Sequence, residues 1–189
     1  LAVDAFGRIV DGDQILAILA LTLRDEGRLK NDTVVATVRS NVGVVNAMRG
    51  AGVKVEQTKV GDRYVLEAMK AGDFVLGGEQ SGHVVMSEHA TTGDGTLTAL
   101  HLMSRMATSG HSLAQLASVM TRLPQVLINV PGVDKSRAAT DPQLTAAVAE
   151  AEAELGDSGR VLLRPSGTES LVRVMVEAES YEAANQVAH

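Results

Sequence analysis

The sequence predicts an α/β protein, in which a mixed, mostly parallel sheet covered by helices is followed by a small α+β C-terminal domain. The first observation behind this prediction is the alternation of strand-like and helix-like segments up to about residue 123, which is typical of parallel sheets covered by helices. The second is a change of pattern at Pro124. The third is composition: 45% of the 189 residues are hydrophobic and 21% are charged, as in globular proteins.

The first ten residues predict two short strands, at residues 1–3 and 8–10, that flank a turn. A helix is expected next, because Asp11 or Asp13 can cap its start, apolar residues follow at helical spacing, and Gly27 can end it. Two carboxylates at this spacing also suggest a metal site. No third ligand follows at the spacing of a calcium loop, so we expect both aspartates to serve as caps or as negative charge at the helix start.

The rest of the first domain continues the alternation. Apolar or β-branched runs predict its strands, and apolar residues at helical spacing, bounded by capping residues and glycines, predict its helices. We expect strands at 33–38, 53–57, 74–76 and 84–86, and helices at 41–48, 62–71, 93–106 and from Ser112 to residue 120 or 123. Asp94 is expected to act as a cap rather than as a metal ligand.

The second domain is expected to begin at Pro124. It should contain a strand at 126–130, a helix from Asp141-Pro142 to residue 155, strands at 160–163 and 171–177, and a last helix capped by Ser180. Proline at the first position of a helix is favoured, because its fixed φ suits the helix and the missing N–H has no partner there. These segments make a small α+β unit.

Composition excludes several classes of protein. Lys and Arg number 17 against 23 Asp and Glu, so the formal net charge is −6, and aromatic residues make up only 2% of the chain. We therefore expect no nucleic-acid partner. No apolar stretch reaches the roughly 20 residues that span a bilayer, so no membrane partner is expected either. The absence of cysteine excludes thiolate metal sites and fits a reducing compartment.

The first concentration of polar chemistry is a glycine-rich segment before the strand expected at 84–86. It reads Gly77-Gly78-Glu79-Gln80-Ser81-Gly82-His83. Glycines permit tight turns and close approach of a ligand, while a carboxylate, an amide and a hydroxyl can bind sugar hydroxyls or an amine. A β-turn with solvated polar residues explains the same composition, so both interpretations stay open. His83 alone is more typical of a packed or capping histidine than of a catalytic one.

The second concentration joins the strands expected at 160–163 and 171–177. It reads Arg164-Pro165-Ser166-Gly167-Thr168-Glu169. Arginine offers a planar fork of donors that suits phosphate, hydroxyls add donors, and a glycine exposes backbone N–H groups that bind anions. Arg173, on the outgoing strand, can reach the same anion. A surface hairpin with an exposed arginine is the alternative, and phosphate binding is the favoured interpretation.

Together these motifs resemble the α-D-phosphohexomutase superfamily, and they are most similar to its bacterial phosphoglucosamine mutase branch. Two further segments carry the resemblance, Ala90-Thr91-Thr92-Gly93-Asp94-Gly95 and Val60-Gly61-Asp62-Arg63-Tyr64-Val65. The resemblance covers essentially the whole chain, with Gln80 and Arg173 pointing to that branch. Two loops in this order, about eighty residues apart, are more specific than either loop alone.

The resemblance implies an isomerase of four domains around a cleft. The first domain carries a phosphorylated serine, the second holds magnesium in an Asp-rich loop, the third binds the sugar and the fourth binds phosphate. Such enzymes interconvert glucosamine 6-phosphate and glucosamine 1-phosphate through a bisphosphorylated sugar that also serves as activator. The product feeds UDP-N-acetylglucosamine and cell-wall synthesis, so a cytoplasmic enzyme is implied.

Carried over by position, the resemblance implies nine substrate-binding residues. They are Glu79, Gln80, Ser81 and His83 in the sugar loop, and Arg164, Ser166, Gly167, Thr168 and Arg173 at the phosphate loop. The role of His83 is left open. Ser170 stands where the family commonly has proline. The resemblance places no catalytic residue and no metal ligand in this chain, because the phosphoserine and magnesium loops are absent.

The chain begins with Leu1 in what reads as a strand and ends at His189 within a helix. We therefore expect it to be part of a longer mutase. Residues 1–10 would be the tail of the second domain, 11–123 the third domain, and 124–189 a shortened fourth domain. The missing N-terminal domains and a hexosamine phosphate are its expected partners, a homodimer is compatible with the sequence, and the isolated chain should be inactive.

Two alternatives to a phosphoglucosamine mutase remain open from the sequence. One is a phosphomannomutase/phosphoglucomutase of the same superfamily, from which Gln80 is the distinguishing residue. The other is a sugar-phosphate-binding module without catalytic activity.

Overall fold

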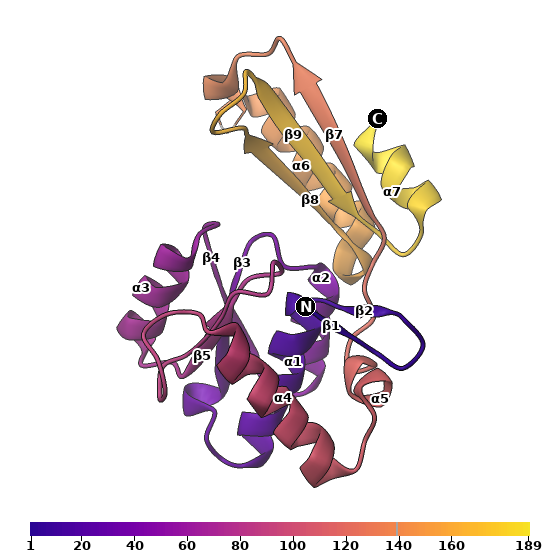
Figure 1. Cartoon of the computed structure of the whole chain (residues 1–189). Coiled ribbons are helices and arrows are strands. Elements are labelled where there is room, and N and C mark those ends of the chain that lie inside the picture. Colours follow the sequence, from indigo (N-terminus) through magenta and orange to yellow (C-terminus); the bar gives the residue numbers. More distant parts are fainter. Residues whose placement is uncertain (139) are drawn as a thin grey trace. The chain divides into compact units, whose positions relative to one another are not determined.

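The computed structural model describes residues 1–138 and 140–189. These residues form two compact units, Leu1–Thr121 and Arg122–His189. Each unit has its own sheet, its own helices and its own apolar core (Figure 1). The predicted fold class, an α/β domain followed by a small α+β domain, is confirmed.

The main sheet of the first unit has four strands in the order β4-β3-β5-β6. The central strand β3 (Thr33–Thr37) is parallel to β4 (Lys54–Thr58) and to β5 (Leu76–Gly78). The edge strand β6 (Val84–Met86) is antiparallel to β5. All five residues of β3 are buried, as expected for a β-branched run covered on both faces. The prediction of a mixed, mostly parallel sheet is therefore confirmed.

Helices cover both faces of this sheet. The helices are α1 (Gly12–Asp25), α2 (Val42–Gly50), α3 (Asp62–Gly72), α4 (Gly95–Ser109) and α5 (Leu113–Ala117). One face packs on α3, through Val65 and Met69 against Val35. The larger core on the other face contains residues of α1, α2, α4 and α5 (Figure 1). A short antiparallel hairpin of β1 (Ala2–Val3) and β2 (Ile9–Val10) and a turn η1 (Lys30–Asp32) complete the unit.

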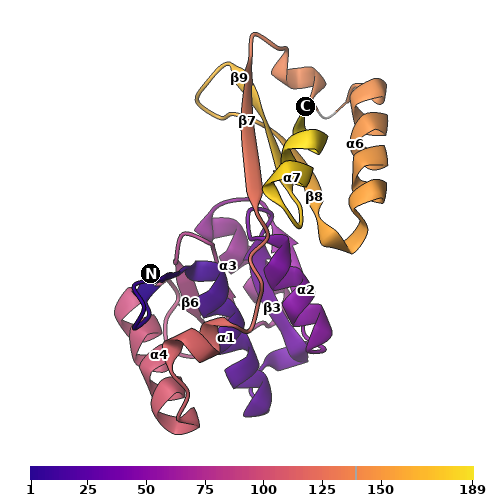
Figure 2. The same ribbon diagram turned by 90° about the vertical axis from the view of Figure 1, so that its right-hand side faces the viewer.

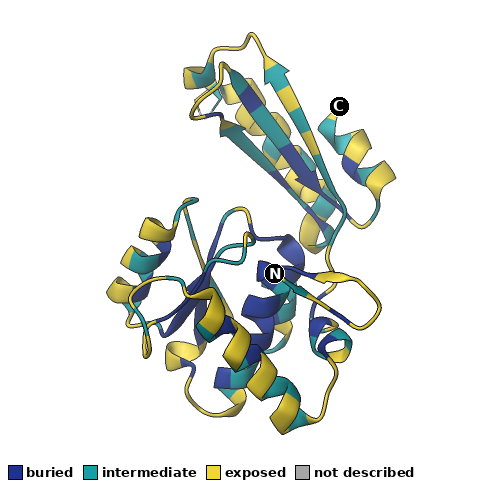
Figure 3. Cartoon of the chain, in the orientation of Figure 1, coloured by how far each residue is buried: buried dark blue, intermediate teal, exposed yellow. Residues whose placement is uncertain are grey.

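Helix α1 is the central helix of the first unit, and it is apolar around most of its circumference. Leu16, Ala17 and Leu19 are at most 2% exposed, and Figure 3 shows most of the helix as buried. A helix apolar on all sides must be surrounded by protein. Its start carries a capping box, in which the Asp11 side chain accepts the Gln14 amide and the Gln14 side chain accepts the Asp11 amide. The predicted cap at Asp11 is confirmed.

The second unit is a three-stranded antiparallel sheet with two helices. Its strands are β7 (Gln125–Pro131), β8 (Arg160–Pro165) and β9 (Leu171–Glu177), in the order β7-β9-β8. Its helices are α6 (Pro142–Leu155) and α7 (Tyr181–Ala188), with short turns η2 (Lys135–Arg137) and η3 (Gly156–Ser158). Both helices pack on the sheet face that carries Val161, Val174 and Val176 (Figure 2). Because side chains alternate along a strand, Arg164 and Arg173 lie on the opposite face.

Several predicted boundaries were wrong by one to a few residues, and three elements illustrate the differences. The strand expected at 74–76 begins later, at Leu76, because the Phe74 amide closes α3 by donating to the Met69 carbonyl. The helix expected at 93–106 begins after its cap at Asp94 and runs on to Ser109. The helix after Ser112 ends at Ala117, because the next amides bond three residues back rather than four.

No helix within the described residues is long and apolar enough to cross a membrane.

Candidate functional site

The sugar-loop motif forms a tight turn between β5 and β6. The Glu79 amide donates to the His83 carbonyl at 3.0 Å, and the Gly82 amide donates to the Glu79 carbonyl at 2.9 Å. Gly82 has a φ of +96°, which favours glycine. The turn therefore fixes the backbone from which three polar side chains project, those of residues 79, 80 and 81.

The start of α1 supports this turn from behind. The Gly12 amide donates to the Gln80 carbonyl at 3.1 Å. A Cβ at position 12 would lie 2.3 Å from the Glu79 carbonyl oxygen and 2.6 Å from both the Gln80 oxygen and the Gly82 nitrogen. Position 12, between Asp11 and Asp13, therefore requires glycine, because the start of α1 packs closely against the sugar loop.

We expect Gly12→Ala to destabilise the first unit, because the added methyl group overlaps backbone atoms that cannot rotate away. The cost should be about 1–3 kcal/mol of unfolding free energy, as for overpacked sites, measured by urea denaturation. Gly50→Ala is the matched control, because nothing lies within 4 Å of a Cβ built there at the end of α2. Equal stability of the two variants would contradict the close packing.

The three polar side chains of the sugar loop line a small cavity of about 140 Å³. Its lining residues are Thr37, Arg39, Val60, Glu79, Gln80 and Ser81. They follow β3, β4 and β5 at the carboxyl ends of these parallel strands, where ligands commonly bind in α/β sheets. The structure thus brings together three of the four predicted residues of the sugar loop.

Some polar atoms of this cavity form hydrogen bonds within the protein, and others do not. Glu79 Oε1 accepts the Gly61 amide at 3.1 Å, which ties the sugar loop to the start of α3. Gln80 Nε2 is buried and makes no hydrogen bond within the described residues. A buried donor without an acceptor costs free energy, and a ligand oxygen would satisfy it. The cavity therefore offers both a carboxylate and an amide donor to a ligand.

Arg39 is a cavity residue that the sequence analysis missed. Its guanidinium makes no hydrogen bond or ion pair with the part of the chain that the structure describes. The loop that carries it is held by Asp13, which is fully buried and accepts the Asn41 amide on Oδ2 at 2.8 Å. Asn41 in turn caps α2. The expectation that Asp13 serves only its own helix start was incomplete, because its carboxylate positions a neighbouring loop.

His83 lies away from the lining of this cavity. Its Nε2 is 3.8 Å from the Asp62 carboxylate, and its ring packs so closely on Gly93 that a Cβ there would come within 2.5 Å. These contacts join the sugar loop to the start of α3 and to the loop before α4. The structure favours a packing role for His83.

The phosphate-loop motif connects β8 to β9, and the strand register places Arg164 directly opposite Arg173. Like charges in opposed positions destabilise a sheet unless something neutralises them. Glu169 Oε2 accepts from Arg173 Nη2 at 2.6 Å, while Arg173 Nε is buried without a hydrogen bond among the described residues. Arg173 Nε therefore remains available to a bound anion.

The backbone of the loop offers further donors. The Ser166 side chain is 5% exposed, and its Oγ accepts the Glu169 amide at 3.2 Å, while the Ser166 amide donates to the Leu171 carbonyl. The amides of Gly167 and Thr168, at the exposed tip, donate to none of the described residues. Consecutive free amides at a turn can bind an anion.

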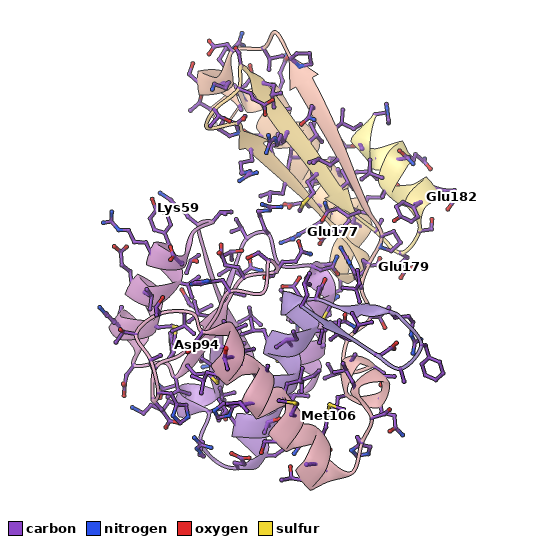
Figure 4. All side chains as sticks on the ribbon, in the orientation of Figure 1. Lys59, Asp94, Met106, Glu177, Glu179 and Glu182 are labelled. Atoms are coloured by element: carbon purple, nitrogen blue, oxygen red, sulfur yellow. The ribbon has the colours of Figure 1, made fainter. Side chains whose placement is uncertain are left out.

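A metal site is not found in the described chain, where no three His, Asp or Glu residues are grouped closely enough to hold an ion. Asp11 caps α1, and Asp13 holds the Asn41 amide. Asp94 lies at the start of α4 (Figure 4) and accepts the amides of Thr96 and Leu97, so its predicted cap role is confirmed. These carboxylates do not fit a magnesium site.

Comparison with known proteins settles the family. Residues 11–123 match the family described as phosphoglucomutase/phosphomannomutase, alpha/beta/alpha domain III, and residues 127–189 match its C-terminal domain. The chain belongs to the phosphoglucomutase/phosphomannomutase family. Phosphoglucosamine mutases of Nocardioides sp. and Frankia alni are 71% and 68% identical to it over 188 residues. The chain spans 42% and 41% of the length of these two relatives.

Solved structures in this superfamily share the fold. N-acetylphosphoglucosamine mutase of Aspergillus fumigatus, in complex with GlcNAc-6P and magnesium, aligns with a TM-score of 0.80 at 23% identity, over 96% of this chain and 46% of that one. Another structure of the same fungal enzyme gives a TM-score of 0.82 at 23% identity, over 98% of this chain and 43% of that one. At this identity the likeness shows the phosphohexomutase fold.

Proposed function

We propose that this chain supplies the sugar-binding and phosphate-binding domains of a phosphoglucosamine mutase, which interconverts glucosamine 6-phosphate and glucosamine 1-phosphate. The observation that carries the proposal is the cavity at the carboxyl ends of β3, β4 and β5, which is lined by Glu79, Gln80 and Ser81. The names of the two bacterial relatives support this assignment.

In this proposal the cavity holds the sugar. The Glu79 carboxylate accepts from a ring hydroxyl or from the amine, and a charged partner makes such a hydrogen bond stronger. The Gln80 amide donates to a ligand oxygen, and the Ser81 hydroxyl can donate or accept. Because Glu79 is tied to the Gly61 amide, its carboxylate is in place before the ligand binds.

The loop between β8 and β9 binds the phosphate that does not react. Arg164 and Arg173 supply charge, and Ser166 shapes the loop whose Gly167 and Thr168 amides donate to the anion. Binding this phosphate orients the sugar, so that its binding energy contributes to catalysis as well as to affinity.

The chemical step belongs to the part of the mutase outside this chain. Phosphoryl transfer needs a nucleophile and neutralisation of phosphate charge. Magnesium supplies such neutralisation when bound, but the described residues do not form a site for it. On this proposal the phosphoserine and the magnesium ligands lie in further domains, a bisphosphorylated sugar is the intermediate, and the enzyme works in the cytoplasm.

The proposal is tested by titrating the 189-residue chain with glucosamine 6-phosphate and following backbone amides by NMR. We expect changes at residues 79–82 and at residues 167–168. Glucosamine without phosphate should move only the first group, and inorganic phosphate only the second. A separate titration with glucose 6-phosphate tests the phosphoglucomutase alternative. No response at residues 79–82 to any of the sugars would overturn the assignment of the cavity.

We expect Glu79→Gln to weaken binding of glucosamine 6-phosphate about tenfold, because a neutral acceptor replaces a charged one. Glutamine keeps an oxygen that can accept the Gly61 amide, so the loop should keep its conformation. Glu67→Gln is the control, since Glu67 pairs with Arg63 on the exposed side of α3. Calorimetry measures both affinities, and an unchanged affinity in Glu79→Gln would argue against contact between this carboxylate and the sugar.

A further inference from the structure

Lys135 lies outside both sequence motifs, in the turn η2 that follows β7. This turn is ordered by Asp134, whose Oδ1 accepts the Ser136 hydroxyl at 2.7 Å and the Ser136 amide at 3.0 Å. These hydrogen bonds lower the pKa of the Asp134 carboxyl below its ordinary value. Lys135 itself forms no ion pair with any residue that the structure describes.

The Lys135 ammonium is bonded instead to the phosphate loop. Its Nζ donates to the Ser166 carbonyl at 2.8 Å and to the Glu169 carbonyl at 2.9 Å. These two carbonyls stand on either side of the loop tip, Gly167-Thr168. A charged donor makes stronger hydrogen bonds than a neutral one, so Lys135 fixes both ends of the tip across more than thirty residues of sequence.

The Gly167 and Thr168 amides lie between these two bonded carbonyls in the sequence. They are at the exposed tip and donate to none of the described residues. We propose that Lys135 is a positioning residue of the phosphate loop, which holds these two amides in the conformation that binds a phosphate group. The inference rests on the proposed function of this loop as a phosphate site.

The positive charge of Lys135 also favours binding of a phosphate anion by this loop. Glu169 places a carboxylate beside Arg173, where it competes with an incoming anion. The Lys135 ammonium donates to the backbone carbonyl of the same Glu169, so it adds positive charge to the loop. Lys135 therefore adds its positive charge to those of Arg164 and Arg173 at this loop. A site of this kind should bind phosphate less well as ionic strength rises.

The experiment uses the 189-residue chain and inorganic phosphate, with the amide signals of Gly167 and Thr168 followed by NMR. Lys135→Met should weaken phosphate binding about tenfold and should shift both signals even without phosphate. Lys135→Arg should recover most of the affinity, because it keeps the charge and the donors. Arg137→Met is the control, because it removes one positive charge from the same turn, and Arg137 pairs with Asp141 rather than with the loop.

Lys135→Gln distinguishes the effect of the hydrogen bonds on the loop conformation from the effect of the positive charge. It also replaces Lys135→Met in the test if that variant does not fold. It keeps N–H donors for the two carbonyls but loses the charge, so its tip signals should stay close to those of the unchanged chain. Equal phosphate affinity of the unchanged chain and a folded Lys135→Met variant would overturn the inference and leave the phosphate loop intact. The same conclusion would follow if Lys135→Gln bound phosphate as tightly as the unchanged chain although its Gly167 and Thr168 signals had shifted. If Lys135→Met and Arg137→Met weakened phosphate binding equally, Lys135 would contribute only its positive charge, and its positioning role would be overturned. No response of Gly167 and Thr168 in the unchanged chain would overturn the phosphate loop and the role of Lys135 together.

Discussion

Arg164→Ala is expected to lower kcat/KM for glucosamine 6-phosphate by about 100-fold in a mutase that contains this sequence. Arg164 stands opposite Arg173 in the strand register, at the point where β8 enters the phosphate loop. On the proposed function, its loss removes a charge-assisted contact that orients the sugar in both half-reactions. The effect should therefore appear in kcat as well as in KM. Steady-state kinetics measures both parameters.

Two further variants make this prediction specific. Arg164→Lys keeps the charge but not the planar fork of donors, so it should recover only part of the activity. Arg28→Ala is the control, because Arg28 pairs on the surface with Glu26 and Glu88 in the first unit. A kcat/KM within about twofold of the unchanged enzyme in Arg164→Ala, roughly 0.4 kcal/mol, would remove Arg164 from the phosphate site.

The helix caps could be predicted because they depend on neighbouring residues. Asp94, Ser112, Asp141 and Ser180 each accept backbone amides two or three residues ahead, so the capping residue and its partner lie in one short window of sequence. The strand at 171–177 was likewise predicted with its observed bounds, since its apolar and β-branched residues are contiguous. Local signals of this kind do not require knowledge of the fold.

The contacts that position the site join residues that are far apart in the sequence. Asp13 reaches the Asn41 amide across 28 residues, and Lys135 reaches the Ser166 carbonyl across 31. Nothing in the sequence near either residue marks its partner, because the partner is chosen by the packing of whole elements. Arg39 illustrates the same point, since a single cation after a buried strand becomes informative only when the parallel order of β3 and β5 is known.

The sequence did predict that Arg173 could reach the same anion as Arg164, but not what fixes the alignment of the two strands. Four residues before Arg164 in β8 and four after Arg173 in β9, Arg160 stands opposite Glu177. Glu177 is fully buried, and its Oε2 accepts from Arg160 Nε at 2.9 Å. A one-residue slip of β8 would separate this buried pair and also move Arg164 away from Arg173. We therefore expect the ion pair at one end of the sheet to protect the geometry of the phosphate loop at the other.

Glu177→Ala is expected to destabilise the second unit by about 3–5 kcal/mol, because it leaves the Arg160 guanidinium, whose side chain is 15% exposed, without this carboxylate. Glu179→Ala is the matched control, since Glu179 lies two residues further on in an exposed position (Figure 4). Urea unfolding, followed through the amide signals of β8 and β9, measures the loss for this unit. The control should change the unfolding free energy by less than about 0.5 kcal/mol.

A paired replacement distinguishes a stabilising ion pair from one that mainly aligns the strands. Arg160→Met combined with Glu177→Leu removes both charges together, and such a replacement often restores stability, because neither charge is left buried alone. If the pair aligns the strands, the double variant should regain its unfolding free energy and yet bind phosphate less tightly than the unchanged chain. Full recovery of both would show that the apolar pattern of β8 and β9 sets their register without the pair. A loss of less than about 1 kcal/mol in Glu177→Ala would show that other groups stabilise Arg160 in its place.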